Sequence, residues 1–189
     1  MRLRSHEDTR VPDPRCQEPP EVAKLPEIVE STTVRAALVF AFHAPFYGSM
    51  GAKPLNEPVV GIAADPATGG YWEVAADGGV FAFHAPFYGS MGAKPLNKPV
   101  VGIAADPATG GYWEVAADGG IFAFHAPFYG SMGGKPLNKP IVGIAADPAT
   151  GGYWEVASDG GVFAFHAPFY GSMGAKALHE PVVGIAATT

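Results

Sequence analysis

A 41-residue unit that repeats almost letter for letter dominates the sequence. The stretch GGYWEVAADGGVFAFHAPFYGSMG occurs, with few changes, at 69–92, 110–133 and 151–174. The 41-residue units that begin at His43 and His84 differ at only two positions. The fold must therefore place the same side chains in the same local surroundings several times, and a site in one unit exists in all of them.

Each unit carries short apolar runs separated by turn signals, which predicts four short β-strands. In the first full unit these strands are predicted at 59–65, 71–76, 80–84 and 86–91. The sequence DPATGG predicts a turn after the first strand, and the sequence DGG predicts a tight hairpin between the second and third. No segment has an apolar period of 3.6 residues long enough for a helix.

Four antiparallel strands every 41 residues predict an all-β fold, a β-propeller in which each unit is one blade. The small residues of VVGIAAD at 59–65 suit the innermost strand, where the blades crowd around the axis. The aromatic strands at 71–76 and 80–84 suit the wider middle of the blade. A parallel β-helix would use shorter rungs without a tight hairpin in each repeat.

The repeats begin and end part-way through a unit, which predicts a shared blade. Residues 38–50 correspond to a third and fourth strand, and 182–189 to a first strand. If these terminal strands complete one blade, the chain has about four blades and no free edge. The second strand of that blade would be a degenerate strand at 29–37. Two alternatives stay open: the chain closes alone, or it pairs with another copy as a homo-oligomer that completes a larger ring.

The repeat resembles a family of actinobacterial β-propeller repeats of the form GGYWxVASDGGVFAFGDAxFYGS, found in secreted and cell-wall-associated proteins. The matching residues are GGYWEVASDGGVFAF at 151–165 and FYGSMG at 169–174, and the resemblance spans about 38–189. Where that family has FGDA this chain has FHAP, so His166 and its equivalents replace Gly-Asp. The resemblance implies a non-catalytic module that is extracellular or cell-wall associated, often fused to extracellular enzymes.

Charge separates an N-terminal tail from the repeats. Every Arg lies within 1–36, and residues 1–28 are predicted to be a disordered tail rich in Arg, Pro and Glu, ahead of a repeat domain at 29–189. The residues after 36 carry six Lys against eleven carboxylates without a basic stripe, so we expect no nucleic-acid partner. Cys16 has no partner for an internal disulfide and no metal-ligand spacing around it.

Two further sequence patterns concern the cellular compartment of the protein. No apolar run approaches the roughly 20 residues that a membrane span needs, so no transmembrane segment is expected. The first twenty residues lack the apolar core of a secretory signal peptide. The sequence by itself leaves open an intracellular protein or a chain that lacks its true beginning, whereas the resemblance implies an extracellular location.

The predicted hairpin places the polar side chains of Tyr71, Glu73 and His84 on one face of its strands. With a two-residue turn it has two registers, in which His84 faces either Tyr71 or Glu73. Both registers put Trp72 and the two Phe residues of VFAF on the opposite face. Because a buried carboxylate needs a partner, a structural Glu–His hydrogen bond is favoured over an acid–base pair or a metal site. The histidines kept as binding candidates are His84, His125 and His166.

Aspartates at the ends of the predicted first strands are weak candidates for a metal at the channel mouth. They are Asp65, Asp106 and Asp147. Carboxylate oxygens suit Ca²⁺, but capping of the DPATGG turn is the favoured role. The fourth copy has Thr188 at this position, which would break a ring of carboxylates.

The tryptophans of YWEV are candidates for stacking on a sugar, as in lectin propellers. They are Trp72, Trp113 and Trp154. Core packing beside the Phe residues of the next strand is the favoured interpretation.

No nucleophile elbow, P-loop, dinucleotide fingerprint, HExxH or CxxC motif occurs. The absence of these motifs predicts a non-enzymatic binding or scaffold module without a cofactor. The family resemblance implies a cell-wall polysaccharide or a protein as its partner. Two alternatives stay open. In the first alternative, the chain is a truncated or decayed fragment of a larger secreted repeat protein. In the second, it is a lactonase-like enzyme with a metal at the channel mouth.

Overall fold

The computed structural model describes residues 39–51 and 53–187. They belong to one compact unit, Thr33–Thr189. The predicted tail at 1–28 and the predicted degenerate strand at 29–37 lie outside the described residues, as does Thr188.

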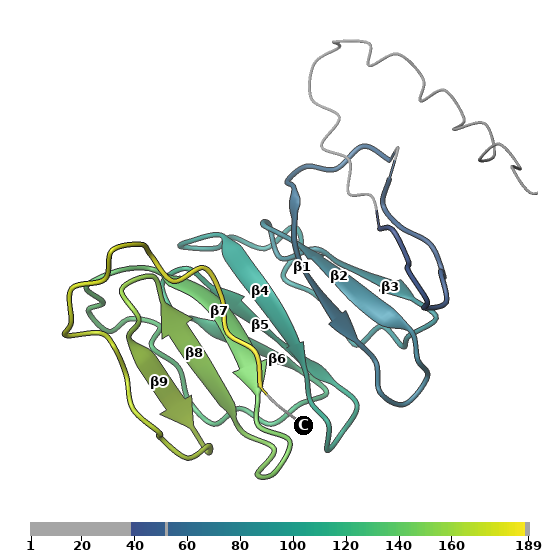
Figure 1. Ribbon diagram of the computed structural model, residues 1–189. Helices are drawn as coiled ribbons and strands as arrows, with labels where there is room; N and C mark the ends of the chain where they lie inside the picture. The colour runs from purple at the N-terminus through teal and green to yellow at the C-terminus, as the bar shows by residue number, and fades with distance from the viewer. Residues whose placement is uncertain (1–38, 52, 188–189) are drawn as a thin grey trace, which may run out of the picture. The chain divides into compact units, whose positions relative to one another are not determined.

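Each full repeat folds into a three-stranded antiparallel sheet whose strands follow chain order (Figure 1). The first sheet contains β1 (Val59–Ala64), β2 (Tyr71–Ala75) and β3 (Val80–Phe83). The second contains β4 (Val100–Ala105), β5 (Tyr112–Ala116) and β6 (Ile121–Phe124), and the third β7 (Ile141–Ala146), β8 (Tyr153–Ala157) and β9 (Val162–Phe165). The predicted all-β class is confirmed for this part of the chain, where no helix is long and apolar enough to cross a membrane.

The segment PFYGSM, predicted as a fourth strand, is irregular in every described repeat. Pro86 has no N–H to donate, and Gly89 has a φ of +129°, far from an extended strand. The N–H of Tyr88 donates to the hydroxyl of Tyr112 in the next sheet at 3.2 Å instead of to a neighbouring strand. The prediction of four strands per unit is therefore wrong for the three sheets described.

The hairpin between β2 and β3 has a three-residue loop. Ala75 N–H donates to the Gly79 carbonyl at 2.8 Å, and Gly78 N–H donates to the Ala75 carbonyl at 2.9 Å. Gly78 has a φ of +77°, the left-handed conformation that the last residue of such a loop requires. The extra loop residue shifts the register by one, so that Tyr71 pairs with Phe83.

This register overturns both predicted pairings. His84 lies beyond the end of β3 and pairs with neither Tyr71 nor Glu73. The two Phe residues of VFAF share a face with Tyr71, whereas Trp72 pairs with Ala82 on the other face. The predicted face shared by Trp and Phe is therefore wrong, and the same register recurs in the second and third sheets.

Neighbouring sheets meet through their first strands, with β4 between β1 and β7 (Figure 1). A Cβ added to Gly61 would lie 3.4 Å from the Cα of Gly102, so small residues permit this close approach, as the sequence predicts. The core between the first two sheets contains Trp72, Val74, Val80, Val100, Ile103 and Tyr112. The three sheets do not close into a ring among the described residues, so four blades are not observed.

The described parts of the two predicted terminal strands contain no strand. Residues 182–187 nevertheless occupy the position of a first strand beside β7. Val182 N–H donates to the Ser158 carbonyl at 2.9 Å, as Val100 N–H donates to the Ala76 carbonyl two repeats earlier. A first strand without a described second strand has no antiparallel ladder to join, which explains its irregular form.

A prediction concerns the second glycine of the DPATGG turn. A Cβ on Gly111 would lie 2.3 Å from the His125 carbonyl oxygen, so Gly111→Ala should lower the free energy of unfolding by about 2–4 kcal/mol. The matched control is Gly134→Ala, because Ala93 adopts a φ of +65° at the equivalent position. Urea denaturation should show a smaller change for this control, about 1 kcal/mol, since only the positive φ and no backbone clash opposes the new Cβ. Equal stability of the two variants would contradict the close backbone approach.

Candidate functional site

Two of the three candidate tryptophans lie in the core between sheets. Trp72 and Trp113 are fully buried, and the Trp72 ring packs on Tyr112 of the next sheet with centroids 5.0 Å apart. Trp72 Nε1–H donates to the Pro86 carbonyl at 2.7 Å. This arrangement is core packing, and it leaves neither ring a free face for a sugar.

Trp154 has different surroundings, because no complete fourth sheet follows it among the described residues. Its side chain is partly exposed, and its ring lies 6.4 Å from that of Tyr170. With Asp147 and Ile185 it lines a cavity of about 550 Å³. Of the three candidate tryptophans, this one alone reaches a surface cavity.

The tyrosine of each YWEV strand anchors its sheet to the segment before it. The Tyr112 hydroxyl donates to the Gly89 carbonyl at 2.7 Å and accepts from the N–H of Tyr88 at 3.2 Å. Tyr153 repeats both contacts one sheet later. Burial raises the pKa of Tyr112 to about 12, so its hydroxyl stays a donor at neutral pH.

A carboxyl group is buried between sheets in each repeat. Glu73, Glu114 and Glu155 are at most 1% exposed. Glu73 Oε2 accepts from the N–H of Met50 at 3.4 Å. The N–H groups of Met91 and Met132, at the equivalent positions, lower the pKa of Glu114 and Glu155, but they do not reach either carboxyl group with the geometry of a hydrogen bond. The predicted Glu–His hydrogen bond is therefore wrong, since no histidine reaches these carboxyl groups.

Burial raises the pKa of Glu114 and of Glu155 to about 8, and it also raises the pKa of Glu73. The Glu114 carboxyl group faces the hairpin loop of the preceding sheet, where a Cβ on Gly78 would lie 3.0 Å from its Oε2. The charge of Lys94 lowers this pKa and that of Asp77 raises it, both less than burial does. All three glutamates are thus enclosed, and Glu114 and Glu155 are mostly protonated at neutral pH.

The candidate histidines lie at the surface just after the third strands, with φ near the left-handed value of +52°. Each ring stacks on a tyrosine of the preceding repeat, with centroids 4.3–4.5 Å apart. The stacked pairs are Tyr47–His84, Tyr88–His125 and Tyr129–His166. A positive φ suits the Gly that the resembling family has here, and His is among the residues that tolerate it.

The candidate aspartates cap their own turns. Asp65 Oδ1 accepts from the N–H of Ala67 at 2.9 Å, and Oδ2 accepts from the Thr68 hydroxyl at 2.6 Å. Asp106 and Asp147 repeat both contacts. Across residues 39–51 and 53–187, no group of three or more acidic, His or Cys side chains is arranged to hold a metal.

An exposed Phe lies beside each stacked Tyr–His pair in sequence, and we call this combination the aromatic site. In the second repeat it consists of Phe87, Tyr88 and His125. The exposed fraction of the Phe is 57–59% beside the three stacked pairs, at Phe46, Phe87 and Phe128, and 60% at Phe169, whose neighbour Tyr170 carries no stacked His among the described residues. These Phe residues lie in the segment predicted as a fourth strand, so the sequence pattern did not indicate that they are exposed.

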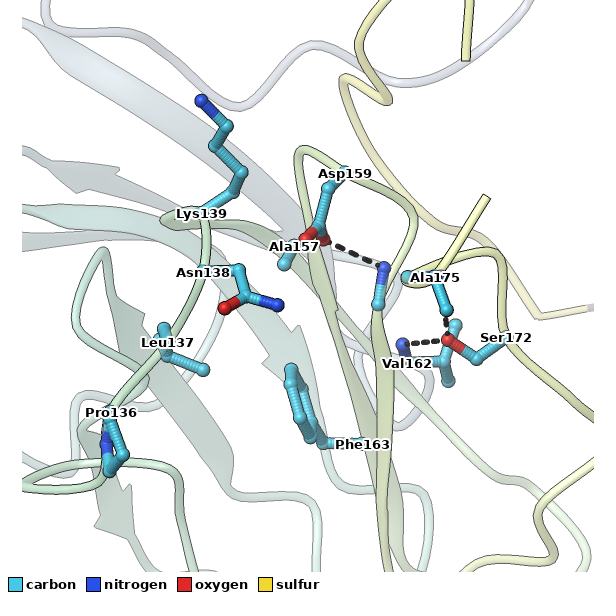
Figure 2. A pocket seen from close by; sticks show the side chains of 12 residues that line it. Pro136, Leu137, Asn138, Lys139, Ala157, Asp159, Val162, Phe163, Ser172 and Ala175 are labelled. Carbon is cyan, nitrogen blue, oxygen red and sulfur yellow. Dashed lines mark hydrogen bonds between the residues drawn. The ribbon is translucent and has the colours of Figure 1, made fainter. Parts of the chain in front are cut away.

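A hollow of about 380 Å³ lies beside the hairpin of the third sheet (Figure 2). Its lining includes Leu137 and Asn138 from a connecting loop, Phe163 from β9, and Ser172. Figure 2 shows the Asn138 amide and the Phe163 ring projecting from different segments toward the same space. The first sheet has an equivalent hollow of about 390 Å³, lined by Leu55, Asn56, Phe81 and Ser90 among others.

Comparison with known proteins gives no assignment. No family model matches the chain, and no curated protein matches it. Among solved structures, the chain is similar to a structural-genomics protein of unknown function from Bacteroides thetaiotaomicron, with a TM-score of 0.47 and 12% sequence identity. The match covers 75% of this chain and 44% of that one, so the chain spans less than half the length of that structure.

The raised pKa of the buried glutamates predicts a pH-dependent stability. Because the folded state keeps protons that the unfolded chain releases above about pH 4.5, stability falls as pH rises from 4.5 to about 8 and is level outside this window. The slope is at most about 1.4 kcal/mol per pH unit for each glutamate. Urea unfolding measured between these two pH values tests this expectation.

The variant Glu114→Gln keeps the shape of the side chain without the titration. It should remove its share of the slope and be more stable than the wild type near pH 8. The control is Glu180→Gln, an exposed carboxylate outside the core. A wild-type stability that rises over the same pH window would contradict the burial of protonated glutamates.

Proposed function

We propose that this chain is a non-enzymatic module that binds a polysaccharide through the repeated aromatic site. The observation that carries the proposal is the exposure of the same Phe side chain by more than half in every copy. Exposed aromatic rings at fixed positions in a folded protein mark contact surfaces. The apolar face of a sugar ring packs on such rings, while the Tyr hydroxyl and imidazole nitrogens supply hydrogen bonds.

Repetition fits a polymeric ligand better than a single small molecule. The aromatic site occurs once in each repeat, so a polymer with a repeating chemical unit can engage several copies at once. Linked weak contacts of this kind gain affinity through effective concentration rather than through any new contact. Multivalent binding therefore benefits from several near-identical repeats, whereas catalysis at a single centre does not need them.

The polar groups support binding rather than catalysis. The enclosed glutamates, the turn-capping aspartates and the exposed histidines lie in separate surroundings, so acid–base partners do not converge on one point. A general base must lie within hydrogen-bond reach of the group that it deprotonates.

We further propose that the sheets are blades of a β-propeller and that its ligand is a cell-wall polysaccharide outside the cell. Support for the blades comes from the packing of successive sheets through glycine-containing first strands. The location and the ligand class rest on the family resemblance of the repeat.

Co-sedimentation with insoluble cell-wall polysaccharide tests the proposal. Phe87→Ala should weaken binding by about fivefold, equivalent to about 1 kcal/mol, and the pair Phe87→Ala and Phe128→Ala should weaken it further. Val60→Ala is the control, since it removes exposed apolar surface outside the aromatic site. Unchanged binding by the double variant, with its thermal stability intact, would contradict the assignment.

A further inference from the structure

We propose that two copies of this chain associate head to tail, the N-terminal face of one copy packing on the C-terminal face of the other. The N-terminal face consists of Phe40, Phe42 and His43. The C-terminal face consists of Tyr170, Gly171 and Val183. Both faces are defined by contacts that the chain makes inside itself at equivalent positions.

The first of these internal contacts is a Phe ring seated on a glycine of the preceding repeat. A Cβ added to Gly48, Gly89 or Gly130 would lie 2.8–3.0 Å from the ring of the Phe in the next repeat. The contacts are Phe83 on Gly48, Phe124 on Gly89 and Phe165 on Gly130. Each glycine is thus a socket that exists because the residue has no side chain.

One Phe ring and one glycine socket of this series make no such contact within the chain. Phe42 is the equivalent of Phe83 one repeat earlier, and it exposes 86% of its side chain. Gly171 is the equivalent of Gly130 one repeat later, and a Cβ there would meet nothing within 4 Å. The free ring lies at the N-terminal end of the repeats and the free socket at the C-terminal end.

The Tyr–His stack shows the same pattern. Tyr88 and Tyr129, which each carry a stacked His from the next repeat, are 37% exposed. Tyr170 stacks on no His among the described residues and is 85% exposed. His43, at a φ of +57°, has the backbone conformation of the stacked histidines but no preceding tyrosine partner among the described residues. A second copy supplies the missing member at each end.

The backbone at the C-terminal face is arranged as it is where two sheets of the chain meet. Residues 182–187 lie beside β7 as β4 lies beside β1, and the Cα of Gly184 would lie 3.4 Å from a Cβ on Gly143. At the other end of the repeats, Ile62 is 53% exposed while Ile103 and Ile144 are 7% exposed. The association therefore continues an interface that occurs twice within the chain.

A second copy is the occupant that this geometry favours over closure of one chain on itself. Residues 39–51 pack on the first sheet, and residues 182–187 pack on the third. Among the described residues, no hydrogen bond links these two segments. Since identical faces are present on every copy, a head-to-tail pair can bury both faces of both chains.

The mass of the full-length chain in solution, measured by light scattering after size exclusion, tests the proposal. The wild type should show twice the mass of one 19.6-kDa chain. Phe42→Asp and Tyr170→Asp should each weaken association more than tenfold and shift the mass to that of one chain. The circular dichroism spectrum should stay as in the wild type, because both side chains are exposed, and the melting temperature should fall only by the stabilisation that the pair contributes.

The matched control is Phe128→Asp, an exposed Phe in a middle repeat, which should leave the mass of the pair unchanged. Mixing Phe42→Asp with Tyr170→Asp should restore a species of two chains, because one intact N-terminal face then meets one intact C-terminal face. A wild type with the mass of one chain would overturn the proposal. So would a pair that survives both substitutions, or a folded mixture that forms no pair.

Discussion

The contact between a buried tryptophan of one sheet and a buried tyrosine of the next holds the repeats together. A three-stranded sheet of this size cannot bury both of its faces alone, and Trp72 and Tyr112 close the gap between two such sheets. The Tyr112 hydroxyl also binds the irregular segment of the preceding repeat through Gly89. The same ring and hydroxyl therefore set the distance between sheets and replace the hydrogen bonds that a fourth strand would make.

This way of packing decides which side chains can meet a ligand. Because Trp72, Trp113 and the glutamates are buried, the most polar and most aromatic part of the repeat motif is enclosed wherever another sheet follows. The Phe and the stacked His of the segment after the third strand lie outside the sheets and stay accessible. The buried Trp and Glu residues of the motif thus pack the sheets together. The binding surface that we propose consists of the Phe and the stacked His outside the sheets.

The sequence alone was enough to predict the all-β class, the strand bounds to within one residue and the capping role of Asp65, because periodic small residues and turn residues act locally. The hairpin register was wrong by one residue, since the sequence DGG is compatible with loops of two or three residues. The hydrogen bonds of Ala75 to Gly78 and Gly79, and the positive φ at Gly78 without one at Asp77, distinguish them. The fourth strand was wrong because the groups that satisfy Tyr88 come from the next sheet, a contact between repeats that local patterns do not contain.

Packing between Trp and Tyr makes the stability of each sheet depend on its neighbour. Amide hydrogen exchange tests this dependence most directly. The variant Trp113→Phe shrinks a ring that packs on Tyr153 at a centroid distance of 4.9 Å. We expect faster exchange in the second and third sheets together, at the strands β5 and β8 alike, because they share one interface. Faster exchange confined to the second sheet, with the third unchanged, would contradict the account.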